Sequence, residues 1–100
     1  MLNFSAMKKR YFSIQFEDGT KVELTPPKMK VLRVVSDLAA QSGTEAAPEL
    51  ITACALILSG NSKKKKYTEK FVEDNLDIDE VHTLISEYFS WVSGIRNDPN

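Results

Sequence analysis

The sequence predicts an α+β fold, mostly helical, in which an N-terminal β-hairpin is followed by three or four α-helices. Residues 12–24 alternate apolar and polar side chains around Asp18-Gly19, a pattern typical of two strands and a tight turn. Later stretches repeat apolar residues at the spacing of a helix face. The chain has 100 residues, the length of one domain. We therefore expect residues 1–100 to form a single domain.

Four segments are expected within this domain. Residues 1–9 are interpreted as a loose N-terminal arm and 11–24 as the β-hairpin. Residues 26–94 form the helical part, and 95–100 form a frayed polar tail.

The hairpin is predicted from alternation on both sides of its turn. Asp18-Gly19 between alternating segments indicates a type I′ turn, in which both central residues have positive φ. Two strands alone are marginally stable in water, so the hairpin must pack on helices or on another sheet. The inward-facing side chains are expected to be Phe12, Ile14, Phe16, Val22 and Leu24.

The first helix is expected to open at Thr25-Pro26-Pro27. Thr25 can accept a capping hydrogen bond, and proline is tolerated in the first turn. Gly43 is placed to end the helix in a left-handed conformation. One face of this helix is apolar: Val31, Leu32, Val35, Leu38 and Ala39.

The second helix is expected between Pro48 and Ser59. Residues 50–58 are apolar nearly all round, which indicates a helix buried on several sides. Lys63–Lys66 are then expected to form an exposed loop, because no apolar residue between Gly60 and Tyr67 could anchor it. Thr68 can cap a short third helix that ends near Asn75.

The last helix is expected to begin after Asp77 and run to about Val92, with Gly94 beyond it. Asp77 and Glu80 have the spacing of a capping box. Its core stripe is predicted to be Ile78, Val81, Ile85, Phe89 and Val92. A second apolar stripe lies beside it: Leu84, Trp91 and Ile95, with Tyr88 between the two.

This second stripe is the candidate protein-binding site. A chain of 100 residues has little further core to cover it. Either Leu84, Tyr88, Trp91 and Ile95 contact the hairpin or the arm within the chain, or they face a partner or a second copy. Aromatic side chains are favoured anchors in such interfaces.

The charge is divided unevenly along the chain. The net charge is −1, but residues 1–66 hold 11 of the 13 Lys and Arg and 6 of the 14 Asp and Glu, whereas residues 67–100 hold 2 and 8. Such a split suggests oriented association with a partner or a second copy, although an uneven solvated surface gives the same pattern.

The start of the chain has no long apolar segment of the signal-peptide kind. The longest apolar run, residues 50–58, is well short of the roughly 18 residues that a membrane span needs. A cytoplasmic location without membrane association is therefore expected.

The residues carry no catalytic signature, so we expect a protein that is not an enzyme and has no cofactor or metal. The four glycines cannot form a phosphate-binding or dinucleotide-binding motif. Cys54 is the one cysteine and falls in the apolar run, where it acts as a small hydrophobe. His82 is the one histidine; a catalytic or metal role would need partners held at bonding distance.

Lys63–Lys66 leave nucleic-acid binding open as an alternative. Four lysines supply a few phosphate contacts, the basis of sequence-independent binding. The acidic polar face of the last helix opposes such binding.

Three segments together resemble one protein family. These are the hairpin with Phe16-Glu-Asp-Gly-Thr and Leu24-Thr-Pro-Pro, the buried helix ending Leu56-Ile-Leu-Ser-Gly-Asn, and residues 71–80 with Tyr88-Phe-Ser-Trp-Val-Ser-Gly. Their order and content are similar to the tail assembly chaperones of long-tailed phages and prophages of Gram-positive bacteria. The resemblance covers about residues 11–94.

The resemblance implies a non-virion factor that acts in the cytoplasm of the infected host during tail assembly. Family members engage the tape measure protein and help to recruit tail tube subunits. Many are made in two lengths by a programmed ribosomal frameshift.

Overall fold

The fold consists of a two-stranded antiparallel hairpin followed by four helices, so the α+β prediction is confirmed. The computed structural model describes residues 11–40 and 47–97, with side chains described up to Gly94. The expected arm, residues 1–9, and the proposed stop at Gly43 lie outside the described residues. No helix in the described part is long and apolar enough to cross a lipid bilayer.

The hairpin pairs β1 (Phe12–Gln15) with β2 (Lys21–Leu24), and Ile14 lies opposite Val22. The expected type I′ turn is wrong. Among the described residues between the strands, Gly19 has a positive φ of 91° and Asp18 does not. The Gly19 N–H donates to the Phe16 carbonyl at 2.9 Å, which closes a four-residue turn whose last residue is this glycine. This is the arrangement of a turn with a glycine bulge.

Helix α1 (Met29–Ala39) begins later than expected. Lys28 is its N-cap residue, in an extended conformation and without a side-chain cap. The Thr25 hydroxyl instead donates to the Gly60 carbonyl at 3.2 Å. The prolines explain the delay, because a residue that precedes proline is driven away from helical dihedral angles. Residues 25–28 therefore connect β2 to the helix.

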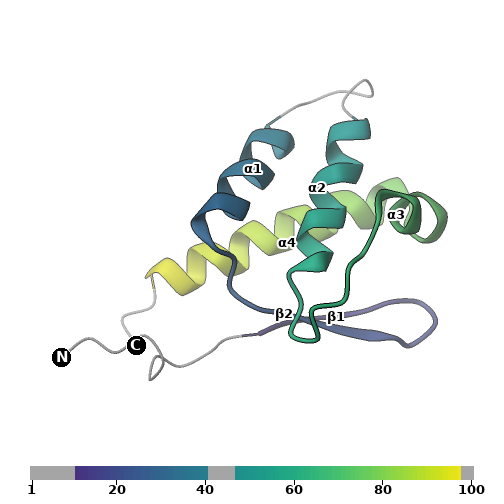
Figure 1. Ribbon diagram of the computed structural model, residues 1–100, viewed down its shortest axis with the longest axis horizontal. Helices are drawn as coiled ribbons and strands as arrows, with labels where there is room; N and C mark the ends of the chain where they lie inside the picture. The colour runs from purple at the N-terminus through teal and green to yellow at the C-terminus, as the bar shows by residue number, and fades with distance from the viewer. Residues whose placement is uncertain (1–10, 41–46, 98–100) are drawn as a thin grey trace.

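Helix α2 (Ala47–Ser59) is the centre of the core, as its apolar sequence predicts. It packs against α1, α3, α4 and β2. Figure 1 shows it between α1 and α3, with the hairpin at its C-terminal end. Ala53, Cys54 and Leu58 are fully buried on it.

Helix α3 (Glu69–Asn75) begins at the predicted cap. The Thr68 hydroxyl accepts a hydrogen bond from the Phe71 N–H at 3.1 Å. The rings of Phe16, Tyr67 and Phe71 pack on one another, with centroids 4.9–6.3 Å apart. This aromatic cluster ties the turn end of the hairpin to α3.

Helix α4 (Ile78–Asn97) begins at the predicted capping box but ends later than expected. The backbone is helical through Gly94 to Asn97, beyond the expected end near Val92. Gly94 has no positive φ. A glycine inside a helix costs about 1 kcal/mol relative to alanine, which weakens a helix without ending it.

The core face of α4 also differs from the predicted stripe. Ile78 is 57% exposed, whereas Leu84 and Tyr88 from the second stripe are 8% and 2% exposed. The buried face is therefore rotated toward the second stripe, because α2 and the hairpin both pack against α4. Val81 and Ile85 are buried as expected.

Candidate functional site

A groove of about 380 Å³ runs between β1 and α4. Its apolar lining comes from both ends of the chain and comprises Phe12, Ile14, Phe16, Leu76 and Leu84. All but Leu84 are partly exposed. We call this feature the acidic groove, because every charged side chain in its lining is a carboxylate.

Four carboxylates line the acidic groove, and the described lining contains no basic side chain. They are those of Asp77, Asp79, Glu80 and Glu87. The capping box fixes two of them: the Asp77 N–H donates to Glu80 Oε1 at 2.9 Å, and the Glu80 N–H donates to Asp77 Oδ1 at 2.8 Å. The groove thus combines an apolar floor with negative charge that the start of α4 holds in place.

The strand that borders the groove has an open edge. Within the described residues, β1 pairs with β2 alone. The other edge of β2 is covered, because Leu24 bridges Asn61 and the Ser62 N–H donates to the Glu23 carbonyl at 2.8 Å. Open strand edges are templates for pairing with another chain.

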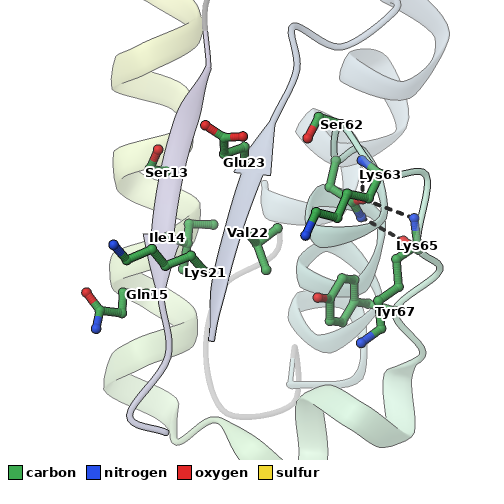
Figure 2. Close-up of a pocket in the computed structure, with 11 residues that line it drawn as sticks. Ser13, Ile14, Gln15, Lys21, Val22, Glu23, Ser62, Lys63, Lys65 and Tyr67 are labelled. Atoms are coloured by element: carbon green, nitrogen blue, oxygen red, sulfur yellow. Dashed lines mark hydrogen bonds between the residues drawn. The ribbon is translucent and has the colours of Figure 1, made fainter. Parts of the chain in front are cut away.

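A second hollow, of about 580 Å³, lies between the hairpin and the lysine loop (Lys63–Lys66), and both β1 and β2 contribute to its lining. Figure 2 shows Lys63, Lys65 and Tyr67 facing β2 across it. Lys21 and Glu23 also line it. The Lys65 ammonium lies 5.1 Å from the centroid of the Tyr67 ring, which is a cation–π contact.

The backbone of the lysine loop is held by the polar side chain of Asn61, which the sequence reasoning did not identify as an anchor. The Asn61 amide group donates to the carbonyls of Leu58 at 2.8 Å and Lys65 at 2.7 Å. Its side-chain oxygen accepts from the N–H groups of Lys63 at 3.1 Å and Lys65 at 3.0 Å. The anchor is polar, which is why a search for apolar residues missed it. The lysine side chains themselves are exposed.

The candidate protein-binding residues are placed differently from one another. Leu84 and Tyr88 are buried, as the intrachain alternative requires, so they are not a free surface. Trp91 is half-buried and stacks on Phe12 of β1. The side chain of Ile95 lies outside the described residues. Of the four, Leu84 borders the acidic groove.

The sequence reasoning missed the other side of this groove. Phe12, Ile14 and Phe16 were expected to be covered by the helices, but they are half-buried along an open strand edge. The acidic residues were interpreted as a capping box and a solvated polar face. Their spacing carried a signal, because Glu80, Thr83 and Glu87 recur at one helix face.

Neither sequence candidate for chemistry lies in this groove. Cys54 is fully buried, and burial raises the pKa of its thiol to about 12, which disfavours the reactive thiolate. His82 is exposed on α4. Among the described residues, no group of three or more His, Cys, Asp or Glu side chains is placed to hold a metal ion.

The acidic groove and the lysine loop are thus surfaces of opposite charge that both border the hairpin. Comparison of this chain with protein-family models, with curated proteins and with solved structures found no match.

Proposed function

We propose that this protein is a non-catalytic tail assembly chaperone of a long-tailed phage or prophage, which binds the tape measure protein and helps to recruit tail tube subunits. The sequence resemblance suggests this role. The observation that carries it is the acidic groove, where the partly exposed apolar side chains of β1 and Leu76 lie beside α4 and form a surface that a partner can cover.

The physical need for such a surface follows from the partner. A very long, apolar, helical tape measure protein is prone to aggregate before the tail tube surrounds it. A small protein that covers apolar segments removes them from water, and its surface charge keeps the complex dispersed. The proposal includes action in the cytoplasm of the host and absence from the finished virion.

Co-expression tests this function. The gene is expressed with the tape-measure reading frame expected beside it in the same phage or prophage genome. We expect soluble, co-purifying tape measure protein with the wild-type chain and insoluble protein without it. Equal insolubility in both cases would overturn the proposal.

Two variants locate the surface used in that assay. Thr83→Arg places a large cation in the acidic groove at an exposed position. Ser90→Arg makes the same change in size and charge at an exposed position on α4 that does not line the groove. We expect the first to reduce co-purification and the second to leave it unchanged.

The alternative function, a small nucleic-acid-associated regulator, is favoured by one observation: Asn61 holds the backbone of the lysine loop, whose four lysines are exposed. DNA affinity that falls steeply with salt and is lost when Lys63–Lys66 are replaced by serine would support this alternative over the chaperone.

A further inference from the structure

The acidic groove has the geometry of a site for one more β-strand. All five consecutive residues 12–16 line it. The rest of its described lining comes from Leu76, Asp77 and α4, and β2 pairs with the other edge of β1, so the groove follows the edge of β1 that β2 leaves free. The groove is therefore bounded by the backbone of β1 as well as by its side chains.

Backbone groups of β1 are available at this edge. The Phe16 N–H donates to the Thr20 carbonyl across the hairpin. In an antiparallel pair the residues alternate, so Phe12 and Ile14 also direct their backbone groups toward β2, and Ser13 and Gln15 direct theirs away from it. None of the described residues supplies a hydrogen-bond partner for the backbone of Ser13 or Gln15.

The two sides of the groove, β1 and the first part of α4, have similar lengths. Residues 12–16 of an extended chain span about 13 Å, and residues 79–87 of a helix span about 12 Å. A segment of four or five extended residues fits between walls of this length. A helix is about 10 Å wide and has no free backbone groups for β1, so it would leave the open edge unpaired.

The charge selects the chemistry of this segment. The described lining holds four carboxylates and no cation, and its floor is apolar. An extended segment that alternates apolar residues with Lys or Arg carries both kinds of side chain that this lining complements, apolar groups for its apolar side chains and cations for its carboxylates.

From these observations we infer that the acidic groove binds an extended segment of a partner protein, with alternating apolar and basic residues, as a third strand on the open edge of β1. This deepens the proposed function, on which it rests, by specifying the form and chemistry of the partner segment. Strand addition of this kind takes affinity from main-chain hydrogen bonds and specificity from the alternate side chains.

Three synthetic peptides test the inference on the full chain. The first is acetyl-Lys-Val-Lys-Val-Lys-Val-Lys-amide. The second replaces every lysine by glutamate. The third keeps the side chains of the first but carries N-methyl groups on its three central residues, which block hydrogen bonding at both edges of an extended peptide. Binding is followed by NMR titration of the labelled protein at low salt.

We expect the first peptide to shift and protect the amides of Ser13 and Gln15. The N-methylated peptide should bind at least tenfold more weakly, and the glutamate peptide should not bind. Asp79→Lys with Glu87→Lys should weaken binding of the first peptide at least tenfold. A matched control, Asp37→Lys with Glu73→Lys, changes the net charge by the same amount at exposed positions outside the groove. At the same salt concentration, its affinity for the first peptide should stay within about twofold of that of the unaltered chain.

Equal binding of the N-methylated peptide would overturn strand addition. Loss of binding in both double variants would show a diffuse charge effect and would also overturn it. If the groove variant abolishes self-association in sedimentation while peptides do not bind, the occupant is a second copy and the inference is wrong. Co-purification of the tape measure protein without peptide binding would leave the chaperone function standing and remove only this inference.

Discussion

The ring of Phe12 on β1 stacks on the ring of Trp91 on α4, with centroids 5.5 Å apart and planes inclined by 24°. This contact joins the first strand to the C-terminal half of the last helix. Tyr88 lies beside it, 6.0 Å from Trp91. The aromatic residues of the last helix thus hold the hairpin, which would be marginal alone.

Replacing either ring should therefore destabilise the fold. We expect Trp91→Ala to lower the free energy of unfolding by about 1–3 kcal/mol, because the ring is half-buried. In a double-mutant cycle with Phe12→Ala, the coupling should be about 0.5–1.5 kcal/mol. Urea denaturation measures both. Additive losses would show that the two rings are not coupled, and a loss of self-association at unchanged stability would instead place Trp91 in an interface.

Asn61 is expected to be the most sensitive polar residue. It is 7% exposed, and its side chain makes four hydrogen bonds to the backbone of residues 58–65. Asn61→Ala should cost about 2–4 kcal/mol, because buried backbone groups lose their partners. Ser62→Ala, at the exposed neighbour, is the control and should change stability by less than about 0.5 kcal/mol. Equal losses of unfolding free energy in the two variants would show that the Asn61 side chain does not anchor the loop.

The lysine side chains should contribute little to stability. They are exposed, and the ion pair found within the described residues joins Lys70 to Asp74 instead. Replacing Lys63–Lys66 by serine should change the free energy of unfolding by less than about 1 kcal/mol, with the Lys65–Tyr67 contact as the largest part. A loss of several kcal/mol would mean that the lysines pair with acidic residues in solution.

Stability should fall at alkaline pH. Burial raises the pKa of Cys54 from 9.0 to about 12, and that of Tyr88 from 10.0 to about 12. In both cases the folded state keeps the proton that the unfolded chain releases. Stability from these groups is complete below the unfolded pKa values and falls as pH rises through them toward about 12, by about 1.4 kcal/mol per pH unit and group.

Cys54→Ala isolates the thiol in that experiment. Urea titrations in reductant from pH 8 to 11 should show a shallower decline in the variant than in the wild-type chain, beginning near pH 9. Tyr88→Phe should flatten the decline that begins near pH 10. If the Cys54→Ala profile runs parallel to that of the wild-type chain, the thiol is not buried as described.

Catalytic turnover is not expected. Cys54 is buried with a raised pKa, and His82 lies on the exposed surface of α4 outside the groove. Hydrolase and nucleotidase assays of the purified protein should give background rates, unchanged in Cys54→Ala and His82→Ala. Activity that disappears in either variant would contradict this prediction.

Local features of this fold were predictable from short stretches of sequence. The hairpin, the Thr68 cap and the Asp77–Glu80 capping box each depend on residues a few positions apart, and all are present. The apolar run of residues 50–58 likewise identified the central helix. Such patterns can be recognised in a sequence because strand alternation and helix caps depend on residues that are near neighbours in the chain.

Features that depend on distant residues were not predictable in the same way. The alternation of β1 did not show that, among the described residues, one of its edges has no paired strand while Asn61 and Ser62 cover that of β2. Periodicity placed two apolar stripes on the last helix without showing which meets α2 and the hairpin. Packing buried Leu84 and Tyr88 and left Ile78 exposed, because burial depends on which surfaces meet across the fold rather than on the hydrophobicity of a residue.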